Sequence, residues 1–237
     1  MTSHDLLSEA VLNNAAWCVS VWRSHDLPVE RRLGLVACEG APPRLFPNVV
    51  AIDAAGVAAD QAGWLGELAA KASGAVSVKD SFAALDLASI GFERLFDADW
   101  IARPAGLGAG GADPALEWRL VETEAELAEW EAAWAGRPGA GAASVFNTGL
   151  LADRGVGFLA GRRDGELAAG CILTPAGRVV GIGNVFGAYE AAVDIAATMF
   201  PDHAIVGYER GEDLKRARGC GFNTLGKLTI WSTSDSI

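Results

Sequence analysis

The sequence has few of the residues that build metal sites and disulfide frameworks. Its 237 residues include four cysteines and three histidines. The cysteines lack Cys-x-x-Cys spacing, and the histidines lie far apart and match no zinc pattern. Four thiols could pair, but nothing in the sequence demands it, so we interpret the cysteines as buried thiols in a protein of the reducing cytoplasm rather than as disulfides, and we expect no metal site.

Positive charge and long apolar runs are also scarce. The chain has 19 basic and 30 acidic residues, for a net charge of −11. Such a surface repels phosphate backbones, so we expect neither nucleic acid nor membrane as a partner. No run of about 20 apolar residues could span a bilayer, and the first 17 residues do not resemble a secretory signal. The 51% hydrophobic content is typical of a folded protein, but it leaves the oligomeric state open.

The clearest break in the chain is the segment GLGAGGADPA, which is rich in Gly and Ala and has no apolar period. It predicts a division into residues 1–105, a linker at 106–115, and residues 116–237. Both parts alternate strands with helices, which predicts an α/β fold with a mixed sheet. The expected helices are 6–22, 57–72, 81–89, a capped helix after Thr123, 191–199 and 212–218. The expected strands are 33–38, 48–52, 75–78, 92–101, 117–121, 156–160, 167–173, 179–186, 204–208 and 223–231.

Two Gly-Phe pairs indicate an internal repeat. Gly91-Phe92 and Gly221-Phe222 each follow a predicted helix and precede a strand that ends near a tryptophan. A similar pairing relates Asn48 in PNVVAI to Asn184 in GNVFGA. The identity between the two parts is low, so the pattern predicts a duplication but leaves open a chance similarity between common αβ units.

Two stretches of the second part resemble a known superfamily. The segment IVGYERGEDLKRARGCGFNTLGKLTIW is similar to the closing strand–helix–Gly-Phe–strand unit of the GCN5-related N-acetyltransferases (GNAT). The hairpin VGFLAGRRDGELAAGCIL resembles their central antiparallel strands. The resemblance covers about residues 117–231 and is weaker in the first part. It implies two GNAT-like halves, each with a mixed sheet flanked by helices, and acetyl-CoA or CoA as the cofactor.

The cofactor loop departs from the family pattern. Members of this superfamily usually carry Arg/Gln-x-x-Gly-x-Gly/Ala before a helix whose N-terminus binds the CoA pyrophosphate. Here that position reads NVFGAYEAAVD, residues 184–194, without Lys or Arg. The resemblance nevertheless implies that cofactor contacts come from the following residues: Val185, Phe186, Gly187, Ala188, Tyr189 and Arg210.

The resemblance also points to candidate chemical groups. In this architecture the thioester enters between two splayed strands, which here end at Phe186 and Tyr208. Glu209 would then act as a general base, Tyr208 as a proton donor, and Asn184 as a substrate contact. Each also has a purely structural reading, as a solvated loop or as a side chain at a strand end.

These inferences leave two functions open. The first is an acyl-CoA-dependent N-acetyltransferase that acts on a small amine through the second half. The alternative is a catalytically inactive GNAT-like protein that binds a small molecule or a protein partner. The loss of the basic phosphate loop favours the alternative, whereas the mostly enzymatic character of the superfamily favours the first.

Overall fold

A computed structural model of the protein describes residues 3–53, 58–107, 110, 113–136 and 144–233. The chain forms two compact units. Unit 1 contains Met1–Trp100, Tyr208–Arg210 and Leu225–Ile237, and unit 2 contains Ile101–Gly207 and Gly211–Thr224. These units divide the chain differently from the predicted boundary at residues 106–115, because the last strand contributes to unit 1. The predicted division into two homologous halves stays a prediction.

Unit 1 is built on a small mixed sheet with the strand order β1-β2-β3-β4-β11. Pairing is antiparallel between β1 and β2, between β2 and β3, and between β4 and β11, and parallel between β3 and β4. The elements of this unit are α1 (Ser3–Ser24), β1 (Val29–Arg32), β2 (Leu35–Cys38), β3 (Val49–Ala51), α2 (Ala58–Lys71), β4 (Ser77–Asp80) and the 3₁₀ turn η1 (Ala88–Ile90), with parts of β5 (Glu93–Arg103) and β11 (Asn223–Ser232).

Helices cover both faces of this sheet. Trp64 and Leu65 of α2 pack on one face against alternate strand residues such as Val49 and Val78. On the other face, α1 contacts β1 and β2, and the amide of its Asn14 accepts a hydrogen bond from the strand residue Lys79. The strand side chains alternate between the two faces, and most buried strand residues of this sheet are apolar on both sides, with Lys79 as a charged exception.

Unit 2 has a larger sheet with the order β10-β9-β8-β7-β6. Neighbouring strands pair in antiparallel fashion except β9 and β10, which are parallel. The elements are β6 (Glu117–Leu120), α3 (Glu124–Trp134), α4 (Thr148–Leu151), β7 (Gly157–Arg163), β8 (Glu166–Ala176), β9 (Val179–Phe186), α5 (Tyr189–Met199), β10 (Ala204–Glu209) and α6 (Gly211–Gly219).

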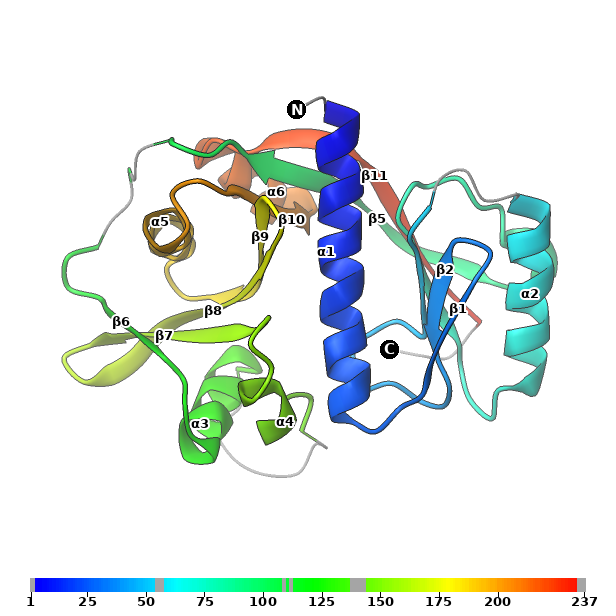
Figure 1. The fold of residues 1–237 in the computed structure, drawn as a ribbon, viewed down its shortest axis with the longest axis horizontal. Coiled ribbons are helices and arrows are strands. Elements are labelled where there is room, and N and C mark those ends of the chain that lie inside the picture. Colours follow the sequence, from blue (N-terminus) through cyan, green and yellow to red (C-terminus); the bar gives the residue numbers. More distant parts are fainter. Residues whose placement is uncertain (1–2, 54–57, 108–109, 111–112, 137–143, 234–237) are drawn as a thin grey trace. The chain divides into compact units, whose positions relative to one another are not determined.

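The sheet of unit 2 also lies between helices. Figure 1 shows α5 on one side of β7 and β8, with α3 and α4 on the other side. Apolar residues of α5, including Val193 and Ala196, are buried against Leu173 and Ile205 of the sheet. On the opposite face, the indole of Trp130 in α3 packs against Phe158 and donates a hydrogen bond to a strand carbonyl. The predicted mixed sheet flanked by helices is therefore confirmed.

The two Gly-Phe pairs have the same local structure. Gly91 and Gly221 adopt positive φ angles of 89° and 86°, and each ends a helical turn. The N–H group of Phe92 donates to Leu87 O, and that of Phe222 donates to Ala217 O, both at 3.2 Å. Each pair leads directly into a strand, β5 or β11. The likeness is local to these turns, and the duplication of the chain stays a prediction.

The predicted elements agree with the structure with one clear exception. The capping box of Thr123 and Glu126 begins α3, and Asp164 and Gly165 form the predicted hairpin turn with positive φ at both residues. The predicted helix at 81–89 is wrong: only η1 forms there. The Asp80 carboxylate accepts hydrogen bonds from the N–H groups of Phe82 and Leu85, which holds this segment in a turn. The short elements β1 and α4 were not predicted.

Candidate functional site

The candidate site lies where β9 and β10 separate. Their parallel pairing runs from Val179↔Ala204 to Gly181↔Val206 and includes no later pair, although both strands continue. Within unit 2, β9 extends five residues further, to Phe186. This edge of β9 therefore presents backbone groups that β10 does not pair, and such groups can bind an extended ligand as an added strand would.

A β-bulge shapes the free part of β9. In the pairing with β8, Gly170 lies opposite Phe186 and Ile172 lies opposite Gly183, so two residues of β9 face one residue of β8. Asn184 is one of the two bulged residues and has a φ angle of 51°. It is half-buried, as expected for a side chain that accommodates a bulged strand.

The bulge also redirects the side chains that follow it. Val185 packs with the same core as Ile182, an arrangement that the two-residue period of a regular strand would not give. Phe186 turns to the opposite face, where its ring centroid lies 5.2 Å from that of Trp130. Gly170 makes room there, because a Cβ atom at Gly170 would lie 2.4 Å from the Phe186 ring.

After β9 the chain makes a tight turn into α5 at Gly187. This residue has a φ angle of 72°, and a Cβ atom there would lie 2.2 Å from Ala168 O. Only glycine therefore fits the turn. Ala188 is the N-cap residue of α5 and makes no side-chain capping bond. The first helical bond runs from Ala192 N to Ala188 O, so the three preceding N–H groups have no acceptor within the helix.

Charge at this turn comes from acidic residues. Residues 184–194 contain no lysine or arginine. Glu190 is exposed in the first turn of α5, whereas Asp194 is buried and accepts a hydrogen bond from Gly110 N at 3.1 Å. Their charge acts on the neighbouring Cys220, whose thiol pKa is raised by burial and further by Glu190 and Asp194. An anion at this turn would depend on backbone donors.

Tyr189 is the one predicted cofactor residue of this segment whose side chain is fully in the core. It is the first residue of α5 and is 5% exposed, packed with the apolar residues of unit 2. Its side chain therefore anchors the start of α5.

The predicted catalytic segment Tyr208–Arg210 belongs to unit 1. The Tyr208 ring packs edge-on against Trp100, with centroids 5.5 Å apart, and its hydroxyl accepts a hydrogen bond from Lys79. Glu209 is the half-buried last residue of β10. The guanidinium of Arg210 lies over the ring of Phe96, with its central carbon 4.2 Å from the ring centroid.

Lys79 is a buried ionisable residue that the sequence analysis did not identify. It is 3% exposed, and its Nζ donates to Asn14 Oδ1 at 2.7 Å and to the Tyr208 hydroxyl at 3.4 Å. Burial lowers the pKa of Lys79, but attraction to Tyr208 and Cys18 and the bond to Tyr208 outweigh it, so the pKa is raised. The sequence offered one indication of this burial, namely a lysine within a strand whose neighbouring residues are buried.

The thiols offer no nucleophile. All four cysteines are free, and burial raises the pKa of Cys38 and of Cys171 to about 12 and also raises that of Cys18. A thiol with so high a pKa stays protonated at neutral pH and reacts poorly. Among the described residues, no group of three or more His, Cys, Asp or Glu side chains could hold a metal ion. Similarly, no helix within the described ranges is long and apolar enough to cross a bilayer.

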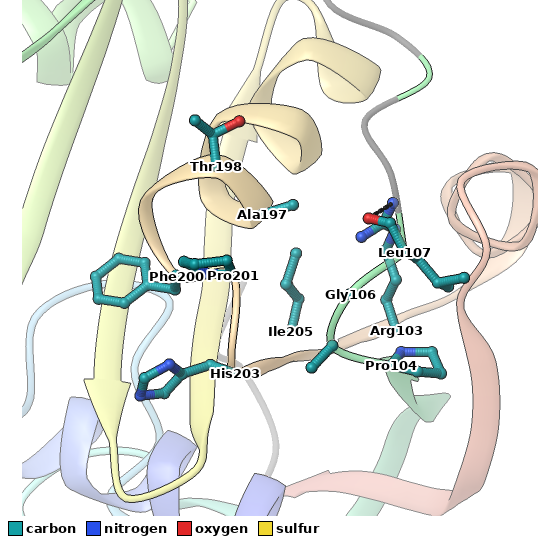
Figure 2. Close-up of a pocket in the computed structure, with 11 residues that line it drawn as sticks. Arg103, Pro104, Gly106, Leu107, Ala197, Thr198, Phe200, Pro201, His203 and Ile205 are labelled. Carbon is teal, nitrogen blue, oxygen red and sulfur yellow. Dashed lines mark hydrogen bonds between the residues drawn. The ribbon is translucent and has the colours of Figure 1, made fainter.

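Unit 2 also contains a small cavity of about 240 Å³ at the other end of α5 (Figure 2). It is lined by residues 103–107, by the end of α5 and by the start of β10, including Phe200 and Ile205. The buried guanidinium of Arg103 donates to Cys220 O at 2.9 Å and to Leu107 O at 3.1 Å. This arginine holds the segment after β5 in place and lies outside the β9–α5 turn.

Comparison with solved structures identifies the class of fold. A GCN5-related N-acetyltransferase from Kribbella flavida aligns with 94% of this chain and 95% of its own, with a TM-score of 0.62 and 16% identity. One from Sphaerobacter thermophilus covers 89% and 77%, with a TM-score of 0.55 and 11% identity. A GNAT-family protein from Novosphingobium aromaticivorans covers 90% and 94%, with a TM-score of 0.52 and 16% identity.

The chain therefore has the fold of the GCN5-related N-acetyltransferases, which confirms the resemblance at the level of the fold. No protein-family model and no curated protein matches the sequence.

Proposed function

We propose that this protein is an acyl-CoA-dependent N-acyltransferase that acetylates a small amine, and that unit 2 binds the cofactor. The observation that carries the proposal is the early end of the β9–β10 pairing at Gly181↔Val206, followed by the bulge at Asn184 and the turn at Gly187. The fold shared with GNAT acetyltransferases supports the same reading.

The turn between β9 and α5 has one feature that favours acyl-CoA binding and one that disfavours it. Gly187 is exposed and has no side chain, and the first N–H groups of α5 have no side-chain cap, so this turn suits the pyrophosphate. The segment supplies no cationic side chain, and Glu190 is acidic. We infer that CoA is held by backbone donors from Phe186 to Tyr189 and by the open edge of β9, with Arg210 as a further phosphate contact, and that it is held weakly.

The proposed reaction needs a base, a stabilised oxyanion and a proton donor. Bound acetyl-CoA would supply a thioester carbonyl carbon; the amine nitrogen bonds to it as the carbon–sulfur bond breaks. In the proposal Glu209 takes the proton that the amine loses, Tyr208 gives a proton to the leaving thiolate, and Asn184 contacts the substrate. Lys79 donates to the Tyr208 oxygen, which leaves the hydroxyl proton available for this transfer.

The proposed acceptor and the proposed cellular location follow from the net charge and from the cysteines. A net charge of −11 attracts cationic amines and repels nucleic acid, so a small amine is the proposed acceptor. The proposed location is the cytoplasm, where the four free thiols would stay reduced. In the tandem organisation that we propose, the first half supports the second without binding CoA.

A thermal-shift titration with acetyl-CoA tests the proposal. Ligand at 100 times its dissociation constant should stabilise the protein by about 2.7 kcal/mol. CoA release measured with a thiol reagent, in the presence of a panel of small amines, should then show turnover. A melting temperature that does not change at millimolar acetyl-CoA would remove the acyltransferase and favour the alternative, an inactive GNAT-like binding protein. The acidic β9–α5 turn is the observation that supports that alternative.

A further inference from the structure

One cavity of unit 1 has no part in the proposed acyl transfer. Its volume is about 670 Å³, within the usual range of about 300–1,000 Å³ for small-molecule sites. It opens between the end of α2, the end of β2 and the beginnings of β3 and β4. The floor is apolar and buried, with Cys38, Trp64 and Val76 exposed by 3%, 7% and 1%.

The cavity lies at the opposite ends of the strands from a GNAT cofactor site. Its lining includes Asn48, just before β3, and Val76, just before β4. In this fold the cofactor is expected at the carboxyl ends of the corresponding strands. The cavity therefore does not correspond to the CoA-binding cleft of this fold, and any ligand has to be inferred from the residues that line the cavity.

Charge at the rim of the cavity is predominantly negative. Glu30 of β1, Glu39 after β2 and Glu67 of α2 line it from three separate elements, and Lys71 is the one cationic residue in the described lining. All four side chains are exposed. Within the described part of the chain, the side-chain carboxylates of the three glutamates take part in no hydrogen bond or ion pair. The three carboxylates are therefore open to solvent, salt or a cationic ligand.

The residues that form and surround the floor favour a ligand that binds without a covalent bond. The pKa of Cys38 is raised to about 12 by burial, so its sulfur is a neutral thiol that does not attack a ligand at neutral pH. Asn48 bonds through its amide to Gly40 O and Ser77 N, which fixes the backbone on two sides of the cavity. The floor is thus apolar, uncharged and held in place by hydrogen bonds.

We propose that this cavity binds an organic ammonium ion with an apolar body. The body rests on the floor formed by Cys38, Trp64 and Val76, and the ammonium group lies among the carboxylates of Glu30, Glu39 and Glu67. A carboxylate or phosphate ligand would meet like charge at the rim and is disfavoured. The inference concerns unit 1 alone and holds whether or not the protein transfers acyl groups.

A matched series of three probes tests the charge preference on the full chain. We would titrate 2-phenylethylamine, 2-phenylethanol and 3-phenylpropanoate, which carry positive, zero and negative charge on similar bodies, and follow binding by calorimetry. The amine should bind most tightly and the acid least. Amine binding should weaken as salt rises from about 0.02 to 0.5 M, because screening acts on exposed charges. Equal binding of the three probes, or no binding of the amine at about 10 mM, would overturn the proposal.

Substitutions of the charged residues at the rim test whether the amine binds in this cavity. Glu39→Gln combined with Glu67→Gln should weaken the amine by about five-fold or more at low salt, and Lys71→Gln should tighten it by about two-fold. Glu93→Gln is the matched control, since this exposed glutamate of β5 makes the same chemical change outside the cavity. If the double variant and the control bind the amine equally, the ligand is bound elsewhere and the proposal fails.

Discussion

The Nζ atom of Lys79 lies 3.4 Å from the hydroxyl oxygen of Tyr208 and 4.5 Å from the centre of its ring. The ammonium has a second polar neighbour in the Asn14 amide and is 3% exposed. A buried lysine whose hydrogen-bond partners are a phenol and an amide is costly to desolvate, because neither partner carries a full opposite charge.

The raised pKa of Lys79 means that its contacts more than offset this cost, so the ammonium stabilises the fold at neutral pH. Lys79→Met, which keeps the length of the side chain, should therefore lower the free energy of unfolding by about 1–3 kcal/mol. Asn14→Leu leaves the buried ammonium without its 2.7 Å acceptor and should cost about 2–3 kcal/mol. Urea unfolding at pH 7 compares both variants with the wild type. An unchanged or higher stability of Lys79→Met would show that the buried ammonium is net destabilising.

Glycine is required at position 187 for two independent reasons, a positive φ angle and the approach of Ala168 O. Gly187→Ala should reduce the free energy of unfolding by at least about 2 kcal/mol and weaken CoA binding. Gly183→Ala, in the strand that leads into this turn, is the control, because its φ is not positive and its Cβ would meet nothing within 4 Å. Differential scanning calorimetry of both variants checks this. Similar melting temperatures for the two would contradict the tight turn.

The capping box of α3 predicts a pH dependence. The pKa of Glu126 lies below its ordinary value because its carboxylate accepts hydrogen bonds from Glu122 N, from the Thr123 hydroxyl and from Thr123 N. A pKa that is lower in the folded state means that the carboxylate stabilises the fold above pH 4.5, the unfolded value. That stabilisation is lost as the pH falls through the folded pKa.

Two substitutions test separately how Glu126 and Thr123 of the capping box contribute to stability. Glu126→Gln should remove the part of the loss of folding stability at acid pH that comes from protonation of Glu126. Thr123→Ala should lower the free energy of unfolding by about 1 kcal/mol at neutral pH. Urea unfolding of wild type and both variants between about pH 3 and 7 measures these effects. An unchanged pH profile in Glu126→Gln would mean that other carboxylates control acid unfolding.

Local patterns made parts of the fold predictable from sequence. The Thr123–Glu126 box and the Asp164–Gly165 turn depend on residues at most a few positions apart, and both were predicted. The helix expected at 81–89 failed because the Asp80 side chain bonds the backbone that would have started it. Helical spacing alone carries no information about such competition.

The candidate site was predictable only in part. The glycine turn before α5 follows from the order of elements and from Gly187 itself. The bulge at Asn184 and the burial of Tyr189 depend on pairing with β8 and on packing in unit 2. Lys79 escaped notice because its burial depends on α1, which is more than 50 residues earlier in the chain. Contacts of that range leave no periodic signal in the sequence.

The proposed chemistry predicts a selective loss of turnover at Glu209. Glu209→Gln should lower turnover by about 10²–10⁴-fold, the range for loss of a positioned general base, with the fold unchanged. Glu93→Gln, the same change on an exposed strand residue, should keep full activity. Steady-state kinetics with saturating acetyl-CoA measures both variants. Full activity in Glu209→Gln would exclude this residue as the base.

The central claim is that unit 2 binds acyl-CoA through backbone donors at an acidic turn, and calorimetric titration with acetyl-CoA tests it most directly. Wild-type protein should bind with a dissociation constant weaker than about 10 µM, because charge-assisted phosphate contacts, each typically worth about 1.5–3 kcal/mol, are missing from residues 184–194. Ala188→Arg should tighten binding by about ten-fold at low salt and less at high salt, whereas Ala188→Gln should not. Absence of binding at millimolar acetyl-CoA would contradict the account, and wild-type affinity well below 10 µM would show that the phosphates bind elsewhere.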